Sequence, residues 1–269
     1  MFKRQQGSGI FMTNEDLEKV LVHGSRAPHF HKDFPLILFW SQKSGCTSFA
    51  HWFFFQIGLL NEAIQYHSFI HTYEYEVYKN KIEYLLELTE EIRNGQKDTV
   101  KLVRNPYKRA VSSFLTLLKQ RPHWNHLREI IFPTNNKNQR VTFKRFLYYI
   151  QKVGAHSAIL DPHFSQQYIQ NEEHIIDNYI QLENYENEIK HIENKYNLRP
   201  SPLSELIESP HHHAPTMTYT GNYADFDITN PDFPKFPTYQ SFYDEETLEL
   251  VTEIFKKDIE MYNYPKGIL

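Results

Sequence analysis

Residues 43–48 combine the residue types that bind a phosphate-like anion. They read Lys43-Ser44-Gly45-Cys46-Thr47-Ser48. Gly45 permits close approach of the backbone, and the helix expected next supplies amide donors and a positive dipole end. Thr47 and Ser48 add hydroxyl donors, while Lys43 adds a cation that can follow charge developing on a leaving phosphate. The alternative is a simple strand-to-helix turn. The nucleoside triphosphate loop is excluded, because the lysine here precedes the glycine.

A second group of potential anion ligands follows another apolar run. Arg104 comes directly after residues 99–103, and Ser112 lies two helical turns along a helix that begins at Pro106, with Arg109 between them. A guanidinium fork and a hydroxyl together can clamp a second phosphate. The alternative is that both arginines form surface salt bridges and that the serine only packs against a helix.

The elements that position these residues alternate between strands and helices. The continuous apolar run 34–40 predicts a strand buried on both faces, and 49–60 predicts a helix after the first loop. Residues 99–103 predict a second inner strand, and Asn105 caps a helix over 107–119. This order is typical of an α/β fold with a parallel central sheet flanked by helices, in which ligands bind beyond the carboxyl ends of the strands.

The rest of the chain is predicted to complete one large domain. Further helices are expected at 13–23, 78–93, 142–153, 184–197 and 244–262, with a strand near 175–182. A length of 269 residues fits a single domain over 1–269. Residues 1–33 are predicted to form an N-terminal extension to it. The stretch 200–242 is predicted to be an irregular loop region and a candidate lid.

Composition narrows the class of protein. The formal net charge of −4 and the lack of a polybasic tail argue against nucleic acid as a partner, so any bound anion must be held by a local group of donors. Cys46 is the only cysteine, which excludes an intrachain disulfide and a cysteine-based zinc cluster. We find neither a signal peptide nor a membrane-spanning segment and therefore expect a cytoplasmic protein.

The two anion motifs together resemble those of a known enzyme family. Residues 42–48 resemble the 5'-phosphosulfate loop of sulfotransferases that use PAPS (3'-phosphoadenosine 5'-phosphosulfate), and residues 103–114 resemble their 3'-phosphate motif. The Gly-Cys-Thr core of the loop is typical of the carbohydrate-type, sulfotransferase family 2-like subgroup. Looser matches to that subgroup occur at 161–167, 182–186 and 258–264. The resemblance implies a P-loop-like sulfotransferase fold.

The resemblance also implies a reaction. Lys43 would bridge the 5'-phosphate and the departing sulfuryl oxygen, and the amides of residues 44–48 would wrap that phosphate. Arg104 and Ser112, with Arg109 beside them, would hold the 3'-phosphate. The co-substrate is PAPS, no metal is needed, and the acceptor is a hydroxyl that we predict to belong to a carbohydrate or glycoconjugate.

Related enzymes place the general base between the two phosphate motifs. The candidates in that interval are His51, His67, His71, Glu62, Glu74 and Glu76. We favour His67 over His71; both are expected in a strand or loop after a helix. His51 is better explained as a packing residue, and each histidine has a structural alternative because the chain contains 15 of them.

Three further features of the sequence are His163, a run of three histidines and a late loop. His163 is expected to start a helix that faces either a substrate or solvent. His211-His212-His213 resembles a metal patch, but three consecutive side chains cannot all point at one ion in regular structure. The resemblance implies that a late loop covers the nucleotide; residues 210–220 are the candidate for this lid, and Lys235 is a lesser one.

Two rival functions remain open. A kinase would need an acidic residue at the end of the second strand, where this chain has Arg104. A non-catalytic protein could use Tyr219, Tyr223 and Phe226 to stack on sugars. The presence of Lys43 favours catalysis, because a protein that only binds has no need for a cation at the leaving-group bridge.

Overall fold

The chain divides into two compact units. The computed structural model describes residues 14–22, 27–119, 121–133, 140–207, 217–235 and 237–267. The first unit comprises residues 1–103 and 169–209, and the second comprises residues 104–168 and 210–269. Each unit has hydrophobic clusters of its own. The single domain over 1–269 stays a prediction.

A three-stranded parallel sheet forms the centre of the first unit. Its strands are β1 (Leu36–Trp40), β2 (Asp98–Val103) and β3 (Asn178–Gln181), with β2 in the middle. In the register, Leu38 lies opposite Val100 and Leu102 opposite Ile180. The predicted α/β class and parallel sheet are therefore confirmed for this part of the chain.

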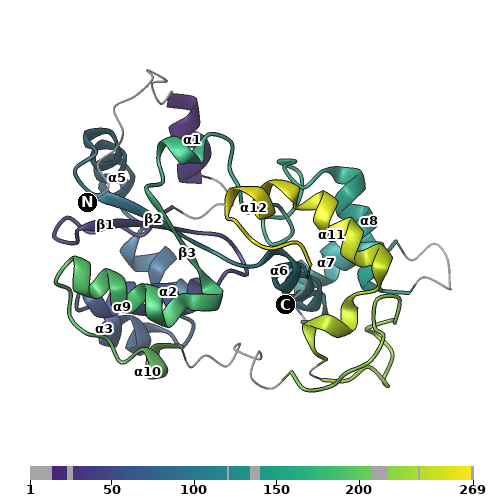
Figure 1. The fold of residues 1–269 in the computed structure, drawn as a ribbon. Helices are drawn as coiled ribbons and strands as arrows, with labels where there is room; N and C mark the ends of the chain where they lie inside the picture. Colours follow the sequence, from purple (N-terminus) through teal and green to yellow (C-terminus); the bar gives the residue numbers. More distant parts are fainter. Residues whose placement is uncertain are drawn as a thin grey trace. The chain divides into compact units, whose positions relative to one another are not determined.

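Helices cover both faces of this sheet (Figure 1). Successive strand residues point to opposite faces. Accordingly, Leu36 and Leu38 pack into a cluster with the helix after β1, while Ile37 and Phe39 pack into a different one. The helices on the first face include α2 (Cys46–Gln56), α9 (Tyr185–Lys195) and α10 (Leu203–Ile207). Those on the second face are α1 (Asn14–Val22) and α5 (Ile82–Asn94).

Short helical segments fill the connection between α2 and α5. They are α3 (Leu60–Tyr66), α4 (Ile70–Tyr73) and a π-helical turn over Glu74–Tyr78. Two 3₁₀ turns, Glu172–His174 and Leu182–Asn184, lie on either side of β3. The connection after α2 matters for the site, because it brings His71 and Glu74 into the interior of the unit.

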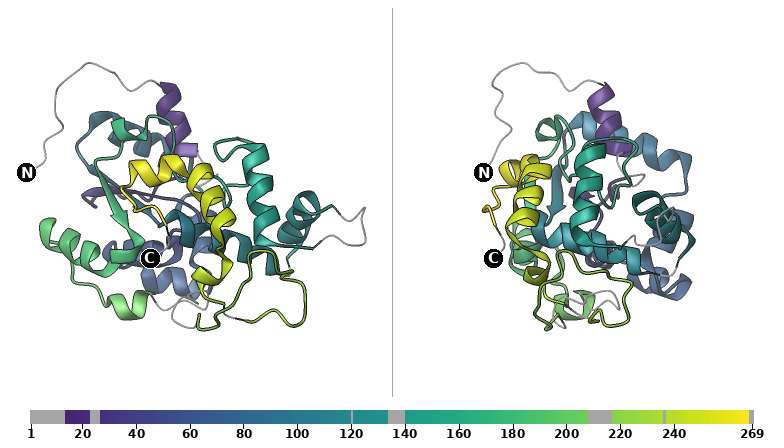
Figure 2. Two further views of the ribbon diagram at one scale, coloured as in Figure 1. Left: turned by 45° about the vertical axis from the view of Figure 1, so that its right-hand side comes forward. Right: turned by 90° about the vertical axis from the view of Figure 1, so that its right-hand side faces the viewer.

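The second unit is helical in its described residues. Its helices are α6 (Pro106–Phe114), α7 (Pro122–Ile131), α8 (Phe143–Val153), α11 (Glu245–Ile254) and α12 (Lys256–Met261), with 3₁₀ turns at Leu115–Leu118 and Tyr239–Phe242. Helices α8 and α11 pack side by side (Figure 2). Phe114, Phe143 and Phe242 are fully buried in the core of this unit.

Several helix boundaries differ from those predicted. The helix predicted over 49–60 begins at Cys46, because Gly45 forms its N-cap, and it ends at Gln56 before Gly58 adopts a φ of 78°. The helix predicted from residue 78 begins at Ile82, after Lys81 in extended conformation. The helix predicted over 244–262 is divided at Phe255.

Three further expectations about secondary structure were wrong. His71 lies in α4, not in a strand or loop. His163 lies in a turn and starts no helix. Helix α7 was not predicted, and α10 interrupts the stretch 200–242, which was expected to be irregular.

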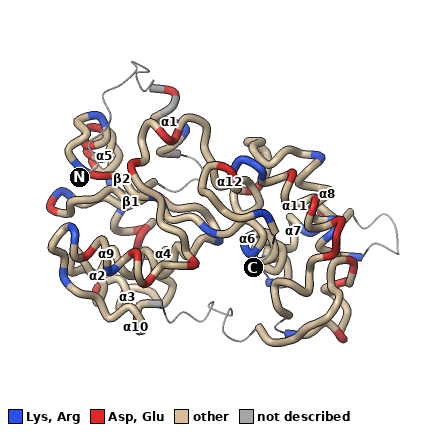
Figure 3. Tube along the Cα trace, in the orientation of Figure 1, with Lys and Arg blue, Asp and Glu red and all other residues tan. Residues whose placement is uncertain are grey.

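Charge of both signs is spread over each unit (Figure 3). No large region of one sign dominates either of them in that view. This distribution agrees with the expectation that an anion must be bound by local donors. None of the helices in the described part of the chain has the length and apolar character needed to cross a lipid bilayer.

Candidate active site

The turn between β1 and α2 contains two residues in the left-handed conformation and is stabilised by a buried serine. Lys43 and Gly45 have φ angles of 67° and 92°. The Ser44 hydroxyl accepts the Ser41 amide at 3.2 Å and donates to the Ser41 carbonyl oxygen at 2.5 Å. A positive φ is uncommon for a residue with a side chain, so the conformation of Lys43 depends on these surrounding bonds.

Helix α2 begins without a side-chain cap. Gly45 is its N-cap residue, and its first hydrogen bond runs from the Phe49 amide to the Gly45 carbonyl oxygen at 3.1 Å. The amides of the first turn precede this bond and lie at the positive end of the helix dipole. A Cβ atom at residue 45 would lie 2.6 Å from Leu182 Cδ1, so glycine is needed here. The turn thus has the geometry that anion binding requires.

A buried histidine and glutamate lie beside the first residues of α2. His71 Nε2 is 3.5 Å from the Thr47 hydroxyl oxygen, and its Nδ1 donates to Glu74 Oε2 at 2.5 Å. The His71 and Glu74 side chains are 1% and 0% exposed. Glu74 also accepts a hydrogen bond from Lys79 Nζ at 2.6 Å, and His29 Nδ1 is 3.7 Å from it.

This environment favours the protonated form of His71. Burial is the largest influence and lowers its pKa, but the charge and hydrogen bond of Cys46, followed by those of Glu74, raise it to about 9. Burial raises the pKa of Glu74, yet the neighbouring Lys79, His29 and His71 hold it well below the usual value. Both shifts favour a charged pair of His71 and Glu74 near the turn before α2.

The other base candidates are placed differently. His67 is exposed at the end of α3, and its Nδ1 accepts the amide of Phe69 at 2.9 Å. His51 Nδ1 bonds the Leu206 carbonyl oxygen at 3.2 Å, and burial lowers the pKa of this histidine. Glu62 and Glu76 accept hydrogen bonds from tyrosine hydroxyls. His51 lies within α2 itself, whereas His71 Nε2 is near Thr47 in the first turn of that helix and Glu74 pairs with His71.

In the second unit, Arg104 follows directly after β2. Hydrogen bonds to its main chain hold it in place. The Arg104 amide donates to Gln167 Oε1 at 2.8 Å, and Gln167 Nε2 donates to the Arg104 carbonyl oxygen at 2.8 Å. The half-buried guanidinium donates from Nη2 to the Tyr239 hydroxyl at 2.7 Å. The predicted Asn105 cap of α6 is confirmed, because its side chain accepts the amides of Tyr107 and Lys108.

The other two predicted ligands on α6 differ in their surroundings. Arg109 is 2% exposed and donates to the Ser165 carbonyl oxygen at 2.6 Å, so it ties α6 to the segment before Gln167. Burial lowers its pKa to about 10, against the opposing effect of Asp258. Ser112 is half-buried, and its hydroxyl has no hydrogen-bond partner among the described residues. Direct contact of Arg109 with a phosphate stays a prediction.

Sequence reasoning assigned no role to the pair that supports Arg104. Asp258 is fully buried and accepts the amides of Gln167 and Tyr168 at 2.8–2.9 Å. Gln167 in turn holds the main chain of Arg104. Both residues fall within the looser family matches, and an aspartate on an apolar face of a C-terminal helix was the signal that a buried role existed.

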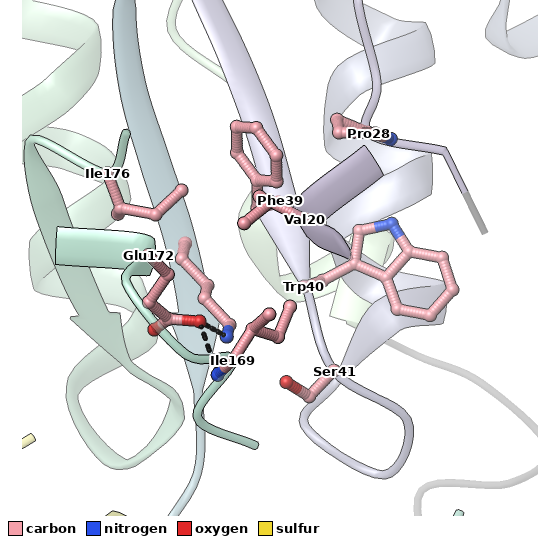
Figure 4. Close-up of a pocket in the computed structure, with 9 residues that line it drawn as sticks. Val20, Pro28, Phe39, Trp40, Ser41, Ile169, Glu172 and Ile176 are labelled. Carbon is pink, nitrogen blue, oxygen red and sulfur yellow. Dashed lines mark hydrogen bonds and ion pairs between the residues drawn. The ribbon is translucent and has the colours of Figure 1, made fainter. Parts of the chain in front are cut away.

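A small pocket at the end of β1 belongs to the interior of the first unit (Figure 4). Its polar residues include Ser41, Lys101 and Glu172. Lys101 Nζ and the Ile169 amide both bond to the Glu172 carboxylate. Both charges are buried and paired, so this pair has a structural role.

The remaining candidates from the sequence are His163, Lys235, the three consecutive histidines and the predicted lid. Asp161 accepts the amide of His163 at 2.9 Å and pairs with its imidazole at 2.8 Å. Lys235 is exposed. His211, His212 and His213 lie outside the described residues, as does most of the predicted lid over 210–220. Within the described ranges, no group of three or more His, Cys, Asp or Glu side chains is placed to hold a metal ion.

The fold is α/β, and its first parallel strand is followed by a turn that leads into a helix without a side-chain cap. The model of the family described as Sulfotransferase family matches residues 31–265. The chain therefore belongs to the sulfotransferase family, as its resemblance to the family 2-like members predicted, and is a transferase of sulfuryl groups. Neither a curated protein nor a solved structure matches the chain.

Proposed function

We propose that the protein transfers the sulfuryl group of PAPS to a hydroxyl of a carbohydrate or glycoconjugate. The observation that supports the proposal is the turn before α2, where Lys43 precedes the uncapped first turn of the helix in a member of the sulfotransferase family. A kinase is disfavoured, because Arg104 stands where a metal-binding acid would be needed.

The proposed step is an in-line transfer. The acceptor oxygen forms a bond to sulfur while the bond from sulfur to the 5'-phosphate oxygen breaks, which gives a sulfate ester and adenosine 3',5'-bisphosphate. Lys43 would neutralise the charge that develops on the bridging oxygen. His71, as a buried cation beside Thr47, would stabilise the same charge.

The proton of the acceptor hydroxyl must pass to a base. A protonated His71 cannot accept it at neutral pH, so His67 remains our candidate. His67 Nδ1 accepts the Phe69 amide, and the neutral ring therefore carries its proton on Nε2. To act as a base, His67 must release that amide, which a local movement of the chain after α3 would permit.

The 3'-phosphate is proposed to bind at Arg104 and Ser112. Arg104 is oriented by Gln167 and Tyr239, and the Ser112 hydroxyl is available for a ligand. A nucleotide with one phosphate at each end would use both sites, whereas adenosine 5'-phosphate would use only the first.

Calorimetric titration tests this assignment of the donor. We expect the wild-type protein to bind adenosine 3',5'-bisphosphate at least tenfold more tightly than adenosine 5'-phosphate or a nucleoside triphosphate, since each charge-assisted hydrogen bond contributes about 1.5–3 kcal/mol. Arg104→Ala should remove the preference. Equal affinities for the three nucleotides in the wild type would refute PAPS as the donor.

Turnover of PAPS tests catalysis separately from binding. Lys43→Ala should reduce kcat by about 100-fold or more, in line with the loss of one preorganised donor to a developing charge. Lys81→Ala, which removes an exposed lysine of the same unit, is the matched control. A Lys43→Ala variant as active as wild type would instead favour a protein that binds the nucleotide without using this lysine.

A further inference from the structure

The hydroxyl of Tyr239 is bound to the guanidinium of Arg104. Arg104 Nη2 and the Tyr239 hydroxyl oxygen are 2.7 Å apart, and the guanidinium carbon lies 5.4 Å from the centre of the Tyr239 ring. A guanidinium only donates hydrogen bonds, so the tyrosine oxygen is the acceptor. Its own proton is left to be donated elsewhere, and no acceptor for it lies within hydrogen-bonding distance among the described residues.

Both partners are fixed by their surroundings. Gln167 holds the main chain of Arg104 on both its amide and its carbonyl. The segment that begins the Tyr239–Phe242 turn is held because the Thr238 amide donates to the Tyr219 carbonyl oxygen at 2.8 Å. At its other end, the Tyr243 hydroxyl donates to the Tyr107 carbonyl oxygen at 2.8 Å.

The pair therefore offers an anion two preoriented donors of different kinds. The guanidinium supplies charge and the phenol supplies one directional O–H donor, and both side chains are half-buried and so reachable by a ligand. A phosphate has enough acceptor oxygens to engage both at once. The Tyr239 hydroxyl oxygen already orients the guanidinium, and its proton can at the same time be donated to the anion.

We propose that Tyr239 is a phosphate-binding residue whose hydroxyl donates to the 3'-phosphate held by Arg104. This inference rests on the proposed function, because the 3'-phosphate is assigned to Arg104 there. It adds a specificity-determining residue to the site, since the hydroxyl would distinguish a nucleotide that carries a 3'-phosphate from one that does not.

The test is Tyr239→Phe, which keeps the ring and removes only the hydroxyl. By calorimetry we expect its affinity for adenosine 3',5'-bisphosphate to fall about tenfold, with its affinity for adenosine 5'-phosphate unchanged. Tyr148→Phe removes the hydroxyl of an exposed tyrosine on α8 of the same unit and should change neither affinity.

The outcomes separate this inference from the function on which it rests. If the wild type does not prefer the bisphosphate, the proposed donor and the role of Tyr239 both fail. If the wild type prefers it and Tyr239→Phe keeps the full preference, only the role of Tyr239 fails. Equal losses for both nucleotides would show that the hydroxyl maintains the structure and does not bind the 3'-phosphate.

Discussion

At the scale of single residues, the charge of His71 decides what it can do. Its pKa of about 9 means that the imidazole is protonated at neutral pH, and it lies beside Thr47 in a turn suited to an anion. A cation there favours the bound donor and the leaving phosphate. The protonated form is lost as pH rises through the pKa, so the benefit of His71 should also be lost over that range.

The pH dependence of catalysis tests this role. We expect the ratio of wild-type kcat to His71→Gln kcat to be largest below pH 8 and to fall towards one as pH rises through about 9. Taking the ratio cancels the titration of other groups that both proteins share. Steady-state turnover of PAPS across pH 6–10 provides the measurement.

Two further variants test whether the pH midpoint of this ratio reports the titration of His71. Cys46→Ser should move the midpoint of the ratio to lower pH, because Cys46 raises the pKa of His71. His67→Gln should leave the midpoint in place. A ratio that increases with pH would show that His71 acts as a base and would overturn its assignment as a cation.

The sequence identified the stretch that contains His67 and His71, but it could not show how the two side chains are placed. His67 and His71 fall in the same short stretch and have the same residue type, so no pattern could rank them. Their difference depends on Glu74, which a π-helical turn carries into the interior, and on Lys79, which pairs with it. Burial and pairing of this kind depend on tertiary structure.

At the scale of elements, the turn into α2 depends on Gly45 for two separate reasons. Its φ of 92° disfavours any side chain, and a Cβ would meet Leu182 at 2.6 Å. We expect Gly45→Ala to destabilise the protein by about 2–4 kcal/mol, because strain and overpacking add. Chemical denaturation measures the change in the free energy of unfolding.

Gly58 provides the matched control for this substitution. Its φ is 78°, but a Cβ there would meet nothing within 4 Å. Gly58→Ala should therefore show only the cost of the left-handed conformation, about 1 kcal/mol. Equal effects of the two substitutions would mean that contact with Leu182 does not constrain the turn.

Helix α12 supports the Arg104 site through Asp258. The buried carboxylate accepts the amides of Gln167 and Tyr168, and Gln167 holds Arg104. Asp258→Asn replaces an acceptor oxygen by a donor, so we expect a loss of about 3 kcal/mol in the free energy of unfolding and weaker binding of adenosine 3',5'-bisphosphate.

The control for Asp258→Asn lies on the same helix. Glu260 is exposed and forms only a 3.7 Å ion pair with Lys256, so Glu260→Gln should change stability by less than about 0.5 kcal/mol. Thermal and chemical unfolding of both variants would distinguish them. A stable Asp258→Asn protein would contradict the supporting role of the carboxylate.

Local signals explain which elements could be predicted. The two inner strands are continuous apolar runs, and the Asn105 and Asp244 caps are residues whose side chains bond the first amides of their helices. The contact between Gln167 and Asp258 joins residues 91 positions apart and has no local signature. Helix α7 was missed for a related reason, since its apolar face is recognisable only against the core it covers.

At the scale of the whole molecule, two units with separate cores each carry one of the proposed anion sites. The chain has a net charge of −4, and charges of both signs are spread over both units, so neither site can rely on a general positive field. Each must bind through its own donors. The family match covers residues of both units.

Hydrogen exchange can establish whether one nucleotide serves both sites. If it does, adenosine 3',5'-bisphosphate should slow exchange of amides in the first turns of α2 and α6 with the same concentration midpoint. Adenosine 5'-phosphate should protect the first turn of α2 alone. Inorganic phosphate serves as the control, because it can occupy the two sites independently. Different midpoints for α2 and α6 with the bisphosphate would mean that the sites bind separate anions, and the assignment of PAPS as the donor would then fail.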